Sequence, residues 1–216
     1  MRQGYLLALA VSAVAGAASA QTTGDSAGLP SHRPSSRPAW SFEISATAYV
    51  VPDDPNYVQP MVTADRSALH LEARYNYEDR RSVSGFIGWT LETGDKVKLG
   101  VTPMIGIVVG RTDGIVPALN LALTWGRLEV YSEGEYVVEA DRNKSFLYDW
   151  SEVSVHATDW LRIGVSSQLT RARNTPSEIQ RGIFAGLTTG RFEGALYLFN
   201  PGSDDAYVVG SVSVAF

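Results

Sequence analysis

The chain has 216 residues, no cysteine and a formal net charge of −5 at pH 7, from 18 Lys and Arg against 23 Asp and Glu. The lack of cysteine excludes a disulfide framework and thiol chemistry. The mildly acidic balance, without a basic cluster interleaved with aromatics, argues against nucleic acid as a partner. The length fits one domain, and the near-neutral mean hydropathy suits strands that alternate apolar and polar residues.

The first 20 residues predict a cleaved secretory signal peptide. A basic start at Arg2 precedes an apolar run from Tyr5 to Ala18 and a small-residue cleavage site, Ala18-Ser19-Ala20. The run is shorter than the roughly 20 residues that a spanning helix needs, which argues against an anchor. Residues 21–39 are rich in Ser, Gly and Pro and predict a disordered periplasmic leader. The domain proper is expected over residues 40–216.

Short polar turns recur along this domain every 32 residues, at Gly94, Gly126, Thr158 and Gly190. A second, longer set of polar segments lies between them. A repeat of this length equals one hairpin, with two strands near the length that a bilayer requires. The pattern predicts strands over 40–51, 67–77, 82–92, 96–109, 115–125, 127–139, 145–156, 160–171, 178–188, 191–200 and 206–216. A twelfth strand at 56–64 makes the count even, and Pro60 makes it the weakest of the set.

The last strand is the most specific feature of the chain. Val208, Gly210, Val212, Val214 and Phe216 share one face, and small or polar residues fill most of the other. The sequence here resembles the outer-membrane β-barrel proteins of Gram-negative bacteria, whose last strand commonly ends in phenylalanine. The resemblance implies an all-β, closed, antiparallel transmembrane barrel of about 12 strands, with 10 as the alternative, and both termini in the periplasm. A soluble β-sandwich is the competing interpretation.

Alternation along the strands predicts which side chains face the lumen. The apolar face of each strand is assigned to lipid, and the polar face points inward. The predicted lumen-lining residues are Glu43, His70, Glu72, Arg74, Lys96, Lys98, Asn120, Glu129, Tyr131, Glu133, Glu135, Glu152, His156, Arg162 and Gln168. Asp149 falls on the lipid face under this alternation, which suggests a position above the bilayer or beside a bulge.

Aromatic residues are predicted to form belts at the two membrane interfaces. The periplasmic belt comprises Trp40, Trp89, Trp125, Trp160 and Phe216, together with Phe192. The outer belt comprises Tyr75, Tyr77, Tyr136, Phe146, Tyr148, Phe199 and Tyr207.

The row of Glu129, Glu133 and Glu135 has two interpretations. It forms a stripe that attracts cations, or it pairs across the lumen with Lys96, Lys98, Arg74 or Arg162, and pairing is favoured because basic groups face the same space. Ser154 and His156 share a face and raise the possibility of lipid hydrolysis. His70 and Glu72 also share a face and could bind a metal. No Gly-x-Ser-x-Gly or His-Glu-x-x-His motif supports either activity, and no cofactor or metal is expected.

The function predicted from these features is a narrow, weakly cation-selective channel for small hydrophilic solutes in the cell outer membrane. One alternative is a closed structural barrel with an ion-paired interior, and a second is an outer-membrane lipid hydrolase. The expected partners are outer-membrane lipid, small solutes or ions, and the barrel-assembly machinery, which would bind the C-terminal strand. The solute, the pore radius and the oligomeric state are not encoded in any recognisable motif.

Overall fold

The computed structural model describes residues 39–216 except 53, 142–143 and 173–174. The predicted signal peptide and nearly all of the predicted leader lie outside the described residues. The described chain is all strand and turn, and no helix in it is long and apolar enough to cross a membrane.

The strands follow one another along the whole domain. They are β1 Ser41–Val50, β2 Tyr57–Arg66, β3 Leu69–Tyr75, β4 Val83–Trp89, β5 Leu91–Thr93, β6 Val97–Val109, β7 Gly114–Trp125, β8 Leu128–Glu139, β9 Phe146–His156, β10 Leu161–Ala172, β11 Glu178–Thr189, β12 Phe192–Phe199 and β13 Tyr207–Ala215. Alternating burial along most of them shows one face turned inward and one outward.

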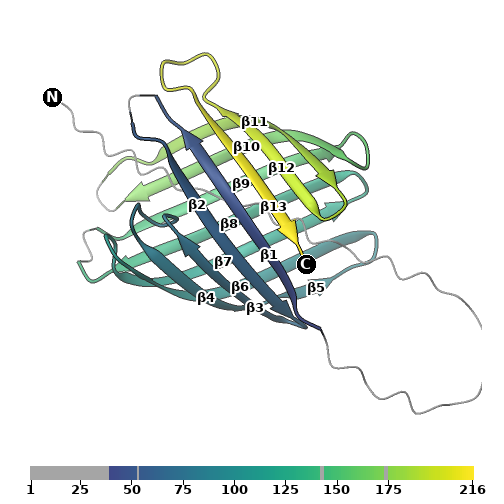
Figure 1. The fold of residues 1–216 in the computed structure, drawn as a ribbon, viewed down its shortest axis with the longest axis horizontal. Helices are drawn as coiled ribbons and strands as arrows, with labels where there is room; N and C mark the ends of the chain where they lie inside the picture. The colour runs from purple at the N-terminus through teal and green to yellow at the C-terminus, as the bar shows by residue number, and fades with distance from the viewer. Residues whose placement is uncertain (1–38, 53, 142–143, 173–174) are drawn as a thin grey trace, which may run out of the picture.

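The strands close into an antiparallel barrel (Figure 1). Apart from β4 and β5, each strand pairs with its neighbours in sequence; β1 also pairs with β13, and β4 pairs with β6. β4 and β5 both pair with β6 and together form one interrupted strand. The barrel therefore has 12 strands, which confirms the predicted architecture and count.

The interruption between β4 and β5 departs from the single strand predicted over 82–92, and proline explains it. The β4–β6 ladder stops at Gly88 and Met104, and the β5–β6 ladder resumes at Leu91 and Val101. Pro103 lies between these two points and has no backbone N–H to donate to a neighbouring strand. The backbone N–H of Thr90 instead donates to the carbonyl of Ala68 in the turn between β2 and β3.

Pro60, in contrast, does not weaken β2. The strand is ten residues long and pairs with β1 from end to end, with Pro60 opposite Ala46. Its ladder with β3 begins only at Met61, so the missing N–H falls where that pairing ends.

The two ends of the barrel differ in their connections. Tight turns, such as Gly126-Arg127 and Gly190-Arg191, lie at the end where β1 begins and β13 finishes, and we call this the short-turn end. Gly126 and Gly190 have φ of 59° and 58°, which glycine adopts without a steric penalty. Longer connections, including residues 76–82 and 200–206, lie at the opposite, long-loop end.

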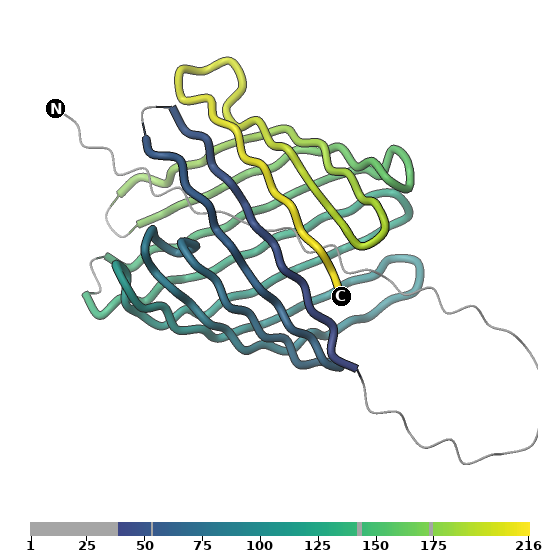
Figure 2. Tube along the Cα trace, viewed as in Figure 1, coloured from purple at the N-terminus to yellow at the C-terminus, as the bar shows by residue number. Residues whose placement is uncertain are grey.

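The strands are strongly tilted, and the pairing climbs as it passes around the wall. Glu43, near the short-turn end of β1, is linked through successive pairs on β2, β3, β4 and β6 to Val116, near the long-loop end of β7. The crossed directions of the near and far strands in Figure 2 show the same tilt. A tilt of about 35–45° is typical of membrane barrels.

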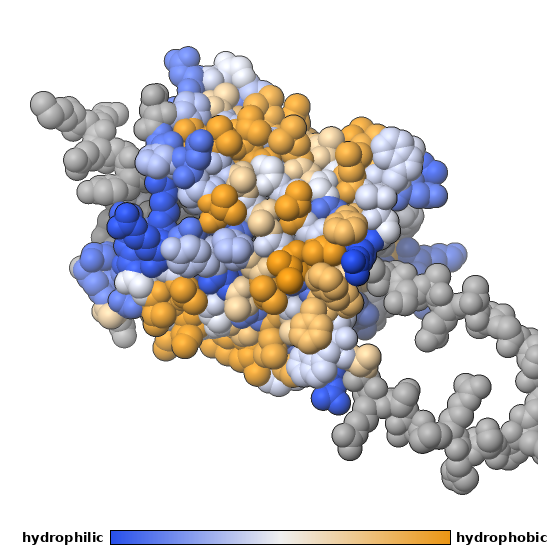
Figure 3. Space-filling view, in the orientation of Figure 1, coloured by the Kyte–Doolittle hydropathy of each residue, from blue (hydrophilic) through white to orange (hydrophobic). Residues whose placement is uncertain are grey.

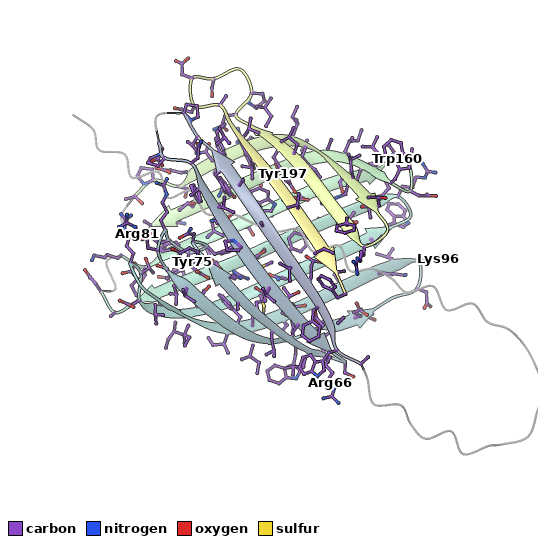
Figure 4. All side chains as sticks on the ribbon, viewed as in Figure 1. Arg66, Tyr75, Arg81, Lys96, Trp160 and Tyr197 are labelled. Carbon is purple, nitrogen blue, oxygen red and sulfur yellow. The ribbon has the colours of Figure 1, made fainter. Side chains whose placement is uncertain are left out.

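The outer wall is apolar over most of its area. Figure 3 shows apolar side chains across the face formed by β1, β2, β12 and β13, and Ile44, Val62, Leu196 and Val212 are 44–62% exposed there. At the short-turn end, Trp40, Trp89, Trp125, Trp160, Phe192 and Phe216 are 40–62% exposed. These rings point away from the barrel interior, as Trp160 does in Figure 4.

The predicted outer aromatic belt is mostly wrong. Tyr75 and Tyr136 are exposed on the wall, but Phe146, Tyr148, Phe199 and Tyr207 are buried inside the barrel. Their heights along the strands fit a belt, but their alternation places them on the same faces as the lumen-lining residues. Tyr77 is also buried, because the chain turns at Asn76 (φ 59°) and carries it inward.

Candidate functional site: the barrel lumen

Most of the residues predicted to line the lumen lie on the inner face. Fully or largely buried there are His70, Glu72, Arg74, Tyr131, Glu133, Glu135, Glu152, Arg162 and Gln168. Glu43, Asn120, Glu129 and His156 are partly exposed. Lys96 and Lys98 are both exposed: Lys96 lies in the β5–β6 turn, at the rim of the barrel in Figure 4, and Lys98 shares the inward face of β6 with Thr102. Neither lysine forms an ion pair with a residue that the structure describes.

A group that we call the Arg74 cluster links two separated parts of the barrel wall. Arg74 projects from β3, and its Nε donates to Glu72 Oε2 at 2.6 Å. Its Nη2 lies 3.0 Å from Glu133 Oε1, and its Nη1 lies 3.1 Å from Glu135 Oε2, both on β8. β3 and β8 are four strands apart around the ring, so these bonds cross the lumen. All four side chains are at most 3% exposed.

Two rings complete the cluster. The guanidinium carbon of Arg74 lies 4.1 Å from the ring centre of Tyr77 and 4.3 Å from that of Phe86. Tyr77 also donates its hydroxyl to Glu133 Oε1 at 2.6 Å. A desolvated arginine between ring faces gains cation–π stabilisation in addition to its ion pairs. Tyr77 was predicted to face outward, so its part in the cluster is new information from the structure.

The loop between β3 and β4 adds another carboxylate. Glu78 is fully buried, and its nearest oxygen lies 3.9 Å from Arg74 Nη1. Burial raises the pKa of Glu78 above its ordinary value, because the charged carboxylate loses its water shell there. Both oxygens lack a hydrogen-bond partner among the described residues. The Arg74 cluster thus holds more carboxylates than its single arginine can pair.

His70 extends the network toward the short-turn end. Its Nδ1 lies 2.6 Å from Asp65 Oδ1, and its Nε2 lies 2.7 Å from Glu72 Oε1. Two carboxylates at hydrogen-bond distance accept from both ring nitrogens only when the imidazole is protonated. The geometry therefore favours a charged His70, which links Asp65 to the Arg74 cluster. His70 and Glu72, considered above as possible metal ligands, contact each other directly.

A second arginine, nearer the short-turn end, forms what we call the Arg162 cluster. Arg162 Nη1 donates to Glu152 Oε2 at 2.9 Å, and Nη2 donates to Glu193 Oε1 at 2.8 Å. Glu129 Oε1 lies 3.8 Å away. Glu129 and Glu193 are 15% and 17% exposed, so this cluster is more open than the first. The predicted pairing of the glutamate row with Arg74 and Arg162 is present, and pairing with the two lysines is not.

An aromatic wall lines the lumen on β9, β12 and β13. Trp150 packs edge-on against Tyr197 and Phe199, and Phe199 stacks on Tyr207. Glu152 Oε1 accepts from Trp150 Nε1 at 2.9 Å and from Tyr197 at 2.8 Å, which joins this wall to the Arg162 cluster. Sequence reasoning missed these residues as lumen groups. The signal was available, because Phe146, Tyr148 and Trp150 alternate in phase with the inward-facing Glu152 and Ser154.

A vestibule of about 660 Å³ opens at the long-loop end. Its lining includes the carboxylates Asp54, Glu178, Asp204 and Asp205 and the amides Gln168, Gln180 and Asn200. Its floor is a bonded chain, in which Tyr207 donates to Gln168 Oε1 at 2.8 Å and Gln168 Nε2 donates to Tyr148 at 3.2 Å.

Ser154 and His156, the pair that suggested a lipid hydrolase, are not hydrogen-bonded to each other. Ser154 is buried on the inner face, and its hydroxyl has no partner among the described residues. His156 Nε2 lies 3.0 Å from Glu129 Oε2 instead of contacting Ser154. Among the described residues, no group of three or more His, Cys, Asp or Glu is arranged to hold a metal ion.

Comparison with solved structures agrees with the fold. The chain is similar to the KdgM porin in complex with disordered oligogalacturonate (TM-score 0.60, 10% identity), covering 81% of this chain and 99% of that one. It is also similar to the NanC porin (TM-score 0.56, 7% identity, 81% and 98% covered). The outer membrane protein Omp33 of Acinetobacter baumannii matches with a TM-score of 0.50 at 11% identity, covering 82% and 98%. No family model and no curated protein matches the sequence.

The fold and the lumen together define a class. The chain folds as a closed antiparallel β-barrel of 12 strands, the architecture of the solved porins, and its interior is charged and cross-linked. Its resemblance to the solved porins lies in the architecture alone, because the sequence identities are only 7–11%.

Proposed function

We propose that this protein is an outer-membrane channel for small hydrophilic solutes, with a narrow lumen that favours cations. The observation that carries the proposal is the charge of the inner face. Carboxylates from β1, β3, β8, β9 and β12 share the lumen with two arginines, two histidines and, near the short-turn rim, Lys98 in the described chain. Low-dielectric walls focus the field of such an excess and raise the local concentration of cations.

The route through the barrel has three parts. The acidic vestibule admits solutes at the long-loop end. The Arg74 cluster and the aromatic wall form the narrowest part, where Tyr148 and Trp150 are fully buried. The partly exposed Glu129 and Glu193 line the widening toward the short-turn end. A barrel of 12 strands falls between those filled by side chains and those with wide channels.

The orientation and surroundings belong to the same proposal. Outer-membrane barrels place short turns in the periplasm and longer loops outside. We therefore assign the short-turn end and both ends of the barrel domain to the periplasm, after removal of the signal peptide over residues 1–20. Outer-membrane lipid would surround the apolar wall, and the assembly machinery would recognise the C-terminal strand.

The test is the reversal potential of the refolded protein in a planar bilayer under a KCl gradient. The wild type should pass small currents with a modest preference for K⁺. Replacing Glu133 and Glu135 with Gln leaves Arg74 with Glu72 as its close partner, and the reversal potential should shift toward anion selectivity. Asp159→Asn removes a carboxylate in an exposed turn and is the matched control, which should leave the selectivity unchanged.

A closed structural barrel is the second candidate, and the burial of the mid-lumen side chains favours it. Tyr49, Tyr148, Trp150 and Glu135 are 0–1% exposed, so side chains fill the middle of the interior. This candidate predicts no conductance for the wild type or for the double variant. It also predicts a large loss of thermal stability when the Arg74 cluster is broken, because the cluster would then serve only to brace the wall.

A further inference from the structure

The outer wall carries one polar patch within its apolar area, on β8 to β11. β6 shows the usual pattern, since its outward residues Val97, Leu99, Val101, Pro103, Ile105, Ile107 and Val109 are all apolar. On β8, β9 and β10 the outward positions instead include Ser132, Asp149, Ser151 and Ser167. Arg181 follows on β11 and is exposed. We call these five residues the wall patch.

Asp149 is held in this patch by its neighbours. Ser132 donates to its Oδ2 at 2.9 Å, and Ser151 donates to its Oδ1 at 2.8 Å. A Cβ added at Gly134, directly across on β8, would lie 3.5 Å from Asp149 Oδ2, so the carboxylate lies flat over that glycine. The pairing of β9 with β8 and β10 is continuous at this point, so no bulge has turned the side chain outward by accident.

The patch lies at membrane depth. Ser151 pairs with Ser132 and Ser167 near the middle of three long strands, and Asp149 lies two residues closer to the long-loop end. Further along the same face toward the short-turn end, Val153 and Val155 are 43% and 47% exposed. An ionisable group that faces lipid at this depth is costly unless another group compensates it.

Arg181 lies level with Asp149 on the far side of β10. Pairing links Asp149 to Leu169 and Leu169 to Ile179. Paired residues lie progressively closer to the long-loop end as strand number increases. A residue at the same membrane depth therefore lies about one position closer to the short-turn end on each successive strand. Two strands therefore move the level position from Ile179 to Arg181. Arg171 is also outward, on β10, and lies opposite Leu147, two residues closer to the long-loop end than Asp149. Neither arginine forms an ion pair with a residue in the described part of the chain.

We propose that the wall patch is a dimer interface for a second copy of this chain, in which Asp149 of each copy pairs with Arg181 of its partner copy. A two-fold axis along the membrane normal, beside Ser167, places Asp149 of each copy opposite Arg181 of the other. Both ion pairs therefore form at once. The small residues Ser132, Gly134, Ser151 and Ser167 let the two walls approach closely. Charge complementarity distinguishes this occupant from lipid chains, which offer Asp149 no partner.

The test uses the full barrel reconstituted in detergent micelles and in vesicles, with mass measured by analytical ultracentrifugation and proximity by energy transfer between labelled copies. The wild type should dimerise. Asp149→Arg and Arg181→Asp each place like charges together twice and should weaken dimerisation by roughly tenfold or more. A mixture of the two variants should form heterodimers, because every contact in the mixed pair is again between opposite charges. Asp159→Arg makes the same charge change in an exposed turn and should leave dimerisation intact.

Recovery in the mixture separates a lost contact from a lost fold, since misfolded variants would not recover. A heat-dependent shift in gel mobility provides an independent check that each variant is a closed barrel. A wild type that is monomeric in both environments, single variants that dimerise as well as the wild type, or a mixture without heterodimers would overturn the proposal. A monomer that retains bound lipid at the patch would assign the surface to lipid instead.

Discussion

The Arg74 cluster and the Arg162 cluster use the same chemistry in different surroundings. Each places one arginine among several glutamates and near an aromatic ring, at 4.1 Å for Tyr77 and 5.0 Å for Phe184. The carboxylates Glu72, Glu133 and Glu135 are at most 3% exposed, whereas Glu129 and Glu193 are 15% and 17% exposed. Water can therefore replace a lost partner in the second cluster more easily than in the first.

Removing the buried arginine should have the largest effect. Arg74→Met would leave Glu72, Glu133 and Glu135 buried without their common partner, and should lower the free energy of unfolding by about 3–5 kcal/mol. Urea unfolding of the barrel in lipid vesicles, followed by tryptophan fluorescence, measures this loss. Arg171→Met removes an exposed arginine from the outer wall and should change the stability little. Equal effects for the two variants would show that the Arg74 cluster does not stabilise the fold.

Glu152 should be the most sensitive carboxylate of the Arg162 cluster. It accepts hydrogen bonds from Trp150, Arg162 and Tyr197, and it is 2% exposed. Glu152→Gln keeps the shape but removes the charge, which should cost about 1.5–3 kcal/mol in the same unfolding measurement. A cost as small as that of an exposed glutamate would mean that Arg162 is satisfied by Glu193 alone.

Glu193 tests the open side of the same cluster. Its contact with Arg162 is short, but its partial exposure lets water and salt screen the pair. Glu193→Gln should therefore lower the stability by at most about 1 kcal/mol. Repeating the unfolding at high salt should shrink this difference further, and a difference that stays constant with salt would contradict the comparison.

Glu78 should respond with the opposite sign. Its pKa is raised by burial, so the folded barrel disfavours the charged form and stability falls as the pH rises through the folded pKa. Glu78→Gln removes that penalty and should leave the stability unchanged or raise it by up to about 1 kcal/mol at neutral pH. The gain should vanish at low pH, where the wild-type carboxyl is protonated. A clear loss of stability would show that the carboxylate has a partner that compensates its burial.

The sequence predicted the barrel because alternation and turn spacing are local signals. Glu72 and Gln168 were assigned to the lumen by counting every second residue, and the tight turns at Gly126 and Gly190 followed from composition. The contact of Arg74 with Glu133 could not be predicted in the same way. It depends on which strands face each other across the lumen, and this follows from closure and tilt rather than from either residue's neighbours.

The errors have equally specific causes. Tyr148 and Phe199 were assigned to the interface from their height along the strands alone, although their alternation pointed inward. The inward direction of Tyr77 depends on a backbone turn at Asn76, which no sequence pattern indicated. Asp149 was recognised as out of phase, and the structure places it on the outer wall with Ser132 and Ser151 rather than beside a bulge.

The most direct test of a cation-favouring route uses the absence of native cysteine. Ser166 faces the lumen and Ser167 faces the outer wall on β10, so cysteines at these neighbouring positions form a matched pair. In reconstituted vesicles, Ser166→Cys should react with a small cationic thiosulfonate faster than with an anionic one of the same size. Ser167→Cys faces away from the lumen at membrane depth, so neither charged reagent should modify it appreciably. A cysteine at position 166 that neither reagent reaches, or that the anionic reagent reaches first, would contradict the account.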